Sequence, residues 1–110
     1  HLDIKEVKGK GVSPGIVKGK AKIVMSVKEL DKIQQGDIIV CDITAPDYLH
    51  ALKKVSAIVA NIGGFTSHSA IVAREFNIPC IVGCGNATNI FEDNDNIEVD
   101  ATKGVVRKID

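Results

Sequence analysis

Two short runs of the chain are wholly apolar, and they limit the folds that it can adopt. Ala57–Ala60 (AIVA) and Ile38–Cys41 (IIVC) contain no charged or amide side chain. A run of four residues is too short for a stable helix, and an uninterrupted apolar strand is typical of a sheet that is buried on both faces. Thr44–Lys54, between the two runs, is predicted to be a helix with Pro46 near its first turn. This strand–helix–strand order predicts an α/β domain with a mixed sheet.

The segments on either side of this unit are predicted to be mainly β. Ile16–Val24 alternates loosely between apolar and polar residues, which favours a strand, and Gly19 within it favours a bulge. Ser26–Gln35 is predicted to be a short helix, with its first residue as the N-cap and Glu29 completing a capping box. Residues 97–109 are predicted to form a closing hairpin.

Composition and charge exclude several classes of function. The 110 residues are 45% hydrophobic and 25% charged, which is ordinary for a globular protein, and we expect one domain over residues 1–110. The chain has 14 basic and 14 acidic side chains, so its zero net charge gives no reason to expect a nucleic-acid or membrane partner. It contains no apolar segment of membrane-spanning length and no signal sequence, and it starts at His1. We therefore expect a cytoplasmic protein and a piece of a larger protein.

The three cysteines favour free thiols over a bridge or a metal site. Cys41, Cys80 and Cys84 are odd in number, and no Cys-x-x-Cys motif or paired histidine accompanies them. Buried thiols in a reducing cytoplasm are the expected state, and no metal site is expected.

One stretch combines turn residues, a helix pattern and an ionisable side chain. GGFTSHSAIVAREFNIPCIVG (Gly63–Gly83) places His68 between a glycine pair and a predicted helix over Ser67–Phe76. Asn77 is suited to a left-handed residue at the helix end, and Pro79 prevents the helix from continuing. His68 therefore lies at the expected N-terminus of a helix.

A histidine at this position could accept a phosphoryl group. Gly63 and Gly64 let a ligand approach the main chain, and Thr66 or Ser67 can cap the helix while its first N–H groups point outward. The positive end of the helix favours an uncharged imidazole, which is a nucleophile. From the residues alone the alternatives stay open: an incidental exposed histidine, a hydrolase that pairs His68 with a neighbouring serine, or a non-catalytic module that binds an anion or a partner.

The same stretch resembles the phosphohistidine signature of the phosphoenolpyruvate (PEP)-utilising enzymes. This family includes PEP synthase (pyruvate, water dikinase), pyruvate, phosphate dikinase, enzyme I of the sugar phosphotransferase system and antibiotic phosphotransferases. Gly-Gly, Thr-Ser-His, Ala-Ile-Val-Ala-Arg-Glu, Ile-Pro and Ile-Val-Gly all fall in the family's register. The resemblance extends to Gly11–Val24 and Gly36–Tyr48, and VGCGNAT (Val82–Thr88) is similar to the synthase branch. It implies the family's swivelling, or mobile, domain with three layers, β/β/α.

The resemblance also implies roles for individual residues. His68 matches the histidine that is transiently phosphorylated and carries the group between an ATP site and a pyruvate/PEP site. Those sites, with their ATP and magnesium, lie on other domains, so no cofactor is expected on this one. Thr66 matches a position of regulatory phosphorylation beside that histidine. Thr44 is a candidate for a phosphate contact or, preferably, for capping a loop. Arg74, six residues beyond His68, is a candidate for a structural or docking role and less so for a phosphate contact.

Overall fold

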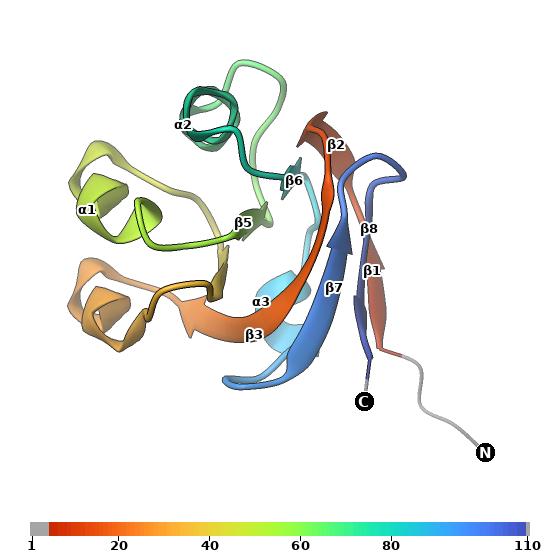
Figure 1. Cartoon of the computed structure of the whole chain (residues 1–110), viewed down its shortest axis with the longest axis horizontal. Coiled ribbons are helices and arrows are strands. Elements are labelled where there is room, and N and C mark those ends of the chain that lie inside the picture. Colours follow the sequence, from red (N-terminus) through yellow and green to blue (C-terminus); the bar gives the residue numbers. More distant parts are fainter. Residues whose placement is uncertain (1–4, 110) are drawn as a thin grey trace.

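The computed structural model describes residues 5–109, and its eight strands form a single hydrogen-bonded series (Figure 1). The order across the series is β1-β8-β7-β3-β4-β5-β6-β2. β3 to β6 are parallel to one another, whereas β1, β2, β7 and β8 pair antiparallel with their neighbours. The strands are β1 (Glu6–Lys8), β2 (Lys10–Ser13), β3 (Ile16–Val24), β4 (Ile38–Cys41), β5 (Ala57–Ala60), β6 (Cys80–Val82), β7 (Asn96–Asp100) and β8 (Val105–Lys108).

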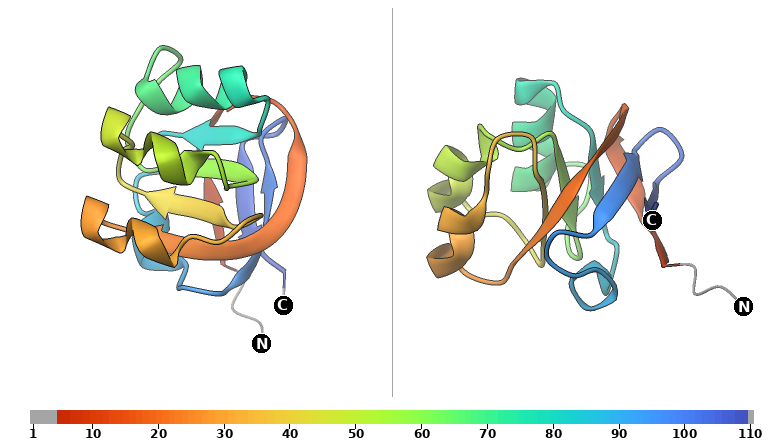
Figure 2. Two further views of the ribbon diagram at one scale, coloured as in Figure 1. Left: turned by 60° about the vertical axis from the view of Figure 1, so that its left-hand side comes forward. Right: turned by 60° about the horizontal axis from the view of Figure 1, so that its bottom comes forward.

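The helices are short and lie mainly in one layer. Figure 2 shows η1, α1 and α2 side by side over one face of the parallel strands, with β7, β8 and β1 on the opposite side. None of the helices in residues 5–109 has the length and apolarity to cross a membrane. The five helical elements are the 3₁₀ helices η1 (Val27–Lys32) and η2 (Pro46–Tyr48) and the α-helices α1 (Leu49–Leu52), α2 (His68–Phe76) and α3 (Ala87–Ile90).

Two hydrophobic cores lie on the two faces of the parallel strands. Along β4, Ile39 and Cys41 face the helices, whereas Ile38 and Val40 face the second sheet. Successive strand residues point to opposite faces, so a strand with cores on both sides must be apolar throughout. Burying each large aliphatic side chain stabilises the fold by roughly 1.5–3 kcal/mol. The predicted three-layer β/β/α architecture is confirmed.

β3 connects the two sheets. Its first half pairs with β7 and its second half with β4, so the long strand curves from one sheet into the other (Figure 1). The predicted bulge at Gly19 is wrong, because this residue pairs with Ile97 in an unbroken register. Gly19 instead leaves room for a neighbouring turn, since a Cβ there would lie 2.9 Å from the carbonyl oxygen of Gly36. The register shift lies in β2, between Gly11 and Ser13.

Gly9 joins the two ends of the strand series. It separates β1 from β2, which occupy the opposite edges, and its N–H donates to the carbonyl oxygen of Gly104 at 2.9 Å. A Cβ at Gly9 would lie 2.6 Å from the carbonyl oxygen of Val82 and 2.8 Å from Cγ2 of Ile81. The absence of a side chain therefore allows the chain to pass directly from one sheet to the other.

Several helical predictions differ from the structure. The helix predicted over Ser26–Gln35 is reduced to the six residues of η1, and the Ser26 side chain makes no capping hydrogen bond. The Glu29 carboxylate accepts from the N–H of Met25 at 2.6 Å, so the predicted capping box is wrong. The helix predicted over Thr44–Lys54 is replaced by the two short helices η2 and α1, which leave Thr44 outside. The closing hairpin of β7 and β8 is confirmed, whereas β1, β2 and α3 were not predicted.

The fold brings three loops together at one edge. The carboxyl ends of β4, β5 and β6 lie side by side because these strands are parallel neighbours. They lead into residues 42–45, 61–67 and 83–86. Loops at the carboxyl ends of parallel strands are the usual location of ligand sites in α/β proteins. His68 follows the second of these loops.

Candidate functional site

His68 is the first residue of α2 and is partly exposed. Its ring nitrogen Nδ1 lies 2.9 Å from Oγ1 of Thr44, which extends from the loop after β4 and is only 3% exposed. Within residues 5–109, no hydrogen bond reaches the other ring nitrogen, Nε2. One nitrogen of the imidazole is thus held by the protein, and the other has no hydrogen-bond partner among these residues.

Ser67, and not Thr66, caps the helix. The Ser67 Oγ accepts from the N–H of Ala70 at 3.4 Å and donates to the carbonyl oxygen of Gly64 at 2.8 Å. The N–H groups of a first helical turn have no partner within the helix, and they carry the positive end of the helix dipole. An anion next to His68 would meet these groups.

The two glycines of the turn have different structural roles. Gly63 has φ = 140°, and a Cβ there would lie 3.1 Å from Ser67 Oγ and 3.4 Å from Cβ of Val82. A side chain at Gly63 would therefore disturb the capping serine as well as strain the backbone. Gly64 has open space around its Cα, and its carbonyl oxygen is the acceptor for Ser67.

The two threonines lie in contrasting environments. Thr66 is exposed on the loop before α2. Thr44 is buried, and the preferred interpretation that it caps a loop is wrong: the N-cap of η2 is Ala45, which makes no side-chain capping bond. The Thr44 hydroxyl instead contacts His68 and Ser69, with its Oγ1 2.6 Å from Ser69 Oγ. Spacing in the sequence could not show this contact, because 24 residues separate Thr44 from His68.

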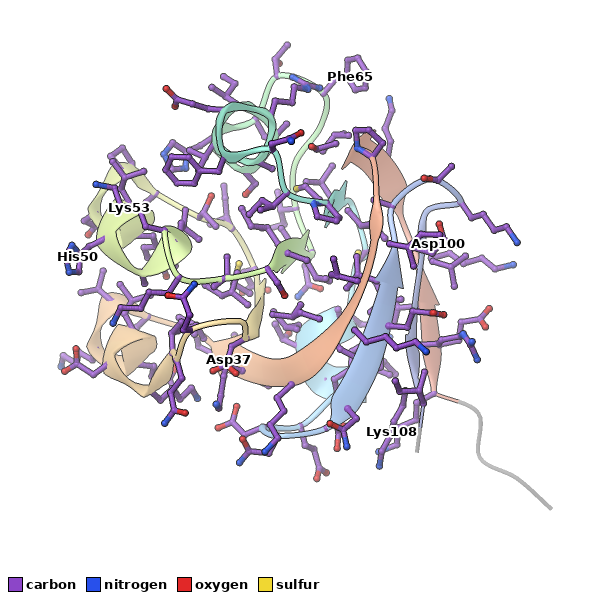
Figure 3. All side chains as sticks on the ribbon, viewed as in Figure 1. Asp37, His50, Lys53, Phe65, Asp100 and Lys108 are labelled. Atoms are coloured by element: carbon purple, nitrogen blue, oxygen red, sulfur yellow. The ribbon has the colours of Figure 1, made fainter. Side chains whose placement is uncertain are left out.

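Arg74 connects α2 with β2 and with the loop before the helix. Its Nε donates to the carbonyl oxygen of Val12 at 2.9 Å, and its guanidinium carbon lies 4.5 Å from the centre of the Phe65 ring. The ammonium of Lys10 lies 5.4 Å from the same ring. Figure 3 shows Phe65 at the outer end of this loop. These two cation–π contacts connect the loop with β2 through Lys10 and with α2 through Arg74.

The Asn61 side chain joins the loop after β4 to the start of α3, and the sequence did not single it out. Its Nδ2 donates to Oδ1 of Asp42 at 2.7 Å and to Oγ1 of Thr88 at 2.9 Å. Its Oδ1 accepts from the N–H of Ala87 at 2.7 Å, and the residue is only 7% exposed. Both amide hydrogens and the amide oxygen are therefore used. Asp42, two residues before Thr44, is held against the loop that leads to His68.

Neither serine beside His68 is placed for hydrolase chemistry. Ser67 is engaged in the helix cap, and Ser69 is 1% exposed with its hydroxyl on Thr44. No serine hydroxyl in residues 5–109 is hydrogen-bonded to the His68 ring. A nucleophilic serine must contact its histidine base and also reach the substrate, so the hydrolase alternative has no support.

The thiols are buried and unpaired, as expected. Burial raises the pKa of Cys41, Cys80 and Cys84 to about 12 in each case. A thiol with a raised pKa is a poor nucleophile and a poor metal ligand at neutral pH. The described residues contain no group of three metal-ligating side chains.

His68 does not line either of two hollows on the described surface. One, of about 370 Å³, lies over β1, β7 and β8 between Glu6, Lys8, Glu98 and Arg107. The other, of about 250 Å³, lies between η1 and α1, next to His50, which Figure 3 shows on the exposed side of α1. The partly exposed His68 lies apart from both.

Comparisons with known proteins identify the family of this domain. The family model for the mobile domain of PEP-utilising enzymes matches residues 33–104, which include His68 and the three loops. The chain belongs to this family. A probable PEP synthase of Methanothermobacter thermautotrophicus is 49% identical over 100 residues, which are 91% of this chain and 15% of the relative. The chain thus spans less than a sixth of that protein.

Solved structures show the same fold in different settings. A solution structure of an Enzyme I protein matches 74% of the mobile domain at 31% identity, with a TM-score of 0.63, and the match covers 34% of that chain. Aconitase X of Thermococcus kodakaraensis matches 96% of the domain with a TM-score of 0.74 and covers 98% of its chain, but at 18% identity. This second likeness concerns the fold alone, so the site residues and not the fold must define the function.

Replacing Asn61 by aspartate is expected to destabilise the mobile domain by about 1–3 kcal/mol. The change removes both amide donors and places a second carboxylate against Asp42. Adding Asp42→Asn is expected to restore most of the loss, because the new amide can donate to the new carboxylate. Urea denaturation of the two single variants and the double variant measures this. Additive losses in the double variant would show that the loops are not held through this pair.

The buried thiols are expected to make the domain sensitive to alkali. Their pKa of about 12 in the folded chain exceeds the ordinary value of 9.0, so between these values only the unfolded chain ionises. Below pH 9.0 the thiols are protonated in both states and should not change the free energy of unfolding. As the pH rises from 9.0 toward 12, ionisation of the unfolded chain should lower that free energy. Denaturation midpoints of wild type and Cys80→Ala across this range measure the effect. An equally steep fall in the variant would exclude a contribution of Cys80.

Proposed function

We propose that this domain is a phosphoryl carrier in which Nε2 of His68 is the atom that is phosphorylated. The observation that carries the proposal is the contact of Nδ1 with Thr44, which leaves Nε2 as the ring nitrogen without a hydrogen bond to residues 5–109, in the first residue of α2. A neutral imidazole whose Nδ1 carries the proton has its lone pair on Nε2. The unpaired N–H groups of the helix supply partners for phosphoryl oxygens.

The proposed reaction requires one displacement in each direction. The Nε2 lone pair attacks phosphorus, an N–P bond forms, and the P–O bond to the donor's leaving group breaks with its electrons on that oxygen. In the return step an acceptor oxygen attacks phosphorus, and the N–P electrons go back to Nε2. The Ser67-capped turn, with Gly63 and Gly64, would stabilise the charge of the transferring group in both steps.

The donor and acceptor are proposed to lie on other domains. The chain covers 11–15% of the length of relatives named PEP synthase or probable PEP synthase, and these relatives are 43–49% identical to it. Their names support PEP chemistry. From the family resemblance we further propose ATP as the donor and pyruvate as the acceptor, bound with magnesium by an ATP-binding domain and a PEP/pyruvate-binding barrel. The exposed position of His68 fits a group that must contact two different sites in turn. We expect this chemistry in the cytoplasm.

Phosphorylation of His68 can be tested with labelled ATP and the ATP-binding domain of the same enzyme. We expect the wild type to acquire an acid-labile, base-stable label, and phosphorus NMR to place it on Nε2. His68→Asn should lose the label completely. His50→Asn is the matched control, because His50 is an exposed histidine on α1 that should not affect labelling. Full labelling of His68→Asn, or a label on Nδ1, would overturn the proposal.

Thr66 is proposed as a regulatory position of the same site. It is exposed and two residues before His68, so a modifying enzyme could reach its hydroxyl. A phosphate on Thr66 would repel an incoming phosphoryl group by like charge. We expect Thr66→Glu to slow labelling of His68 several-fold relative to Thr66→Gln, which has the same shape without the charge. Equal rates for the two variants would contradict an electrostatic effect at this position.

A further inference from the structure

Exposed apolar side chains gather around His68. Within residues 5–109, eight large apolar side chains are exposed, and four of them lie in the two loops and the helical turn next to this histidine. Single exposed apolar residues are common on any protein, whereas a group of them is typical of an interaction surface. This apolar patch consists of Ile43 (50% exposed) after β4, Ile62 (57%) and Phe65 (58%) after β5, and Ile71 (54%) on α2.

The contacts of the two loops and the helix place this patch beside the imidazole. Ile43 precedes Thr44, whose Oγ1 lies 2.9 Å from Nδ1 of His68. The N–H of Ile62 donates at 2.9 Å to the carbonyl oxygen of the residue before Ile43, which holds the second loop against the first. Ile71 is three residues after His68 on α2, which is the spacing of neighbours on one helix face. A domain that brings a phosphoryl group to His68 will therefore lie against these side chains.

Two cations lie at the edge of the patch. The guanidinium of Arg74 and the ammonium of Lys10 are 4.5 and 5.4 Å from the centre of the Phe65 ring, and both residues are exposed. No salt bridge within residues 5–109 involves either cation. Figure 3 shows Phe65 at the outer end of its loop, so the cations are on the outer side of the patch. A complementary surface would be apolar opposite the patch and would carry carboxylates opposite the cations.

We propose that the apolar patch is the docking surface for the domain of the same enzyme that holds the phosphoryl donor, and that this domain is acidic where it meets Lys10 and Arg74. The proposal rests on the phosphoryl-carrier function. The chain spans 11–15% of the relatives named PEP synthase or probable PEP synthase, so most of such an enzyme lies outside this domain and can supply the partner surface.

The charges favour the donor's domain over the acceptor's. The donor's domain meets His68 before transfer, when the patch has cations at its edge and attracts carboxylates. After transfer the phosphoryl group adds negative charge beside the same surface, and like charge then repels an acidic partner. Docking is thus favoured before transfer and weakened after it. Four partly exposed side chains also make a small contact, which suits an interface that must form and break in each cycle.

The experiment uses the 110-residue chain as the substrate of the separate ATP-binding domain and measures labelling at increasing chain concentration. Ile62→Gln and Ile71→Gln should each raise the KM for the chain about fivefold or more and leave kcat unchanged, because they remove apolar contact and keep His68. Val27→Gln is the matched control. Val27 is 46% exposed on η1, with α1 between it and α2 (Figure 2), so its KM should equal that of the wild type.

Salt tests the acidic character of the partner. Higher ionic strength should raise the KM of the wild type several-fold and that of Lys10→Gln by less, because salt screens charges across an exposed interface. A KM that does not respond to salt would overturn the assignment of carboxylates opposite the cations.

The outcomes separate docking from the carrier function. An unchanged KM in both isoleucine variants, or an equal rise in Val27→Gln, would overturn the docking surface even if His68 is labelled normally. Titration calorimetry of the His68→Asn chain with the ATP-binding domain measures docking without transfer. If Ile62→Gln weakens this binding in a chain that is never labelled, the docking surface is supported and the carrier function is rejected. Binding of the chain to the PEP/pyruvate-binding domain alone would overturn the choice of partner.

Discussion

Burial of the parallel strands on both faces is the constraint on which the rest of this domain depends. β4, β5 and β6 are apolar at every position, so a single covering layer would leave half of each strand in water. The helices cover one face, and the other is covered by β7, β8 and β1. The long β3 belongs to both sheets, and Gly9 allows the chain to cross between them without a loop. The three layers are therefore a consequence of a few short apolar segments.

This arrangement also determines where a reactive residue can lie. Parallel strands place all of their carboxyl ends at one edge, and the loops there bring together residues that are far apart in the chain. Asn61 holds these loops by three side-chain hydrogen bonds, and Thr44 reaches His68 from the loop after β4. The His68 ring is therefore oriented by this edge while the residue remains partly exposed. A carrier needs both properties, since it must keep one geometry and contact more than one partner.

The sequence predicted what depends on neighbouring residues and not what depends on pairing across the fold. The α2 helix, a cap at Thr66 or Ser67 and the left-handed Asn77 follow from local rules of capping and backbone conformation. All three are present, with Ser67 as the cap. The lengths of the helices predicted over residues 26–35 and 44–54 were overestimated. Apolar spacing in about a dozen residues does not distinguish one α-helix from two short helical turns. Thr44 was predicted as a cap since its partner on α2 is distant in sequence. Asn61 gave no signal at all, because nothing in its neighbourhood shows what its amide contacts.

The likeness to aconitase X shows that this fold does not by itself require a phosphohistidine. What makes phosphoryl transfer possible is a much smaller set of atoms: an imidazole at a helix N-terminus, one ring nitrogen held from within and one exposed. If Nδ1 were free to face water, the two tautomers would exchange according to the solvent, and either nitrogen could react. The buried hydroxyl of Thr44 removes that freedom by giving Nδ1 a partner inside the protein. The same Thr44 hydroxyl lies 2.6 Å from Oγ of the buried Ser69, so the contacts around the ring continue into α2.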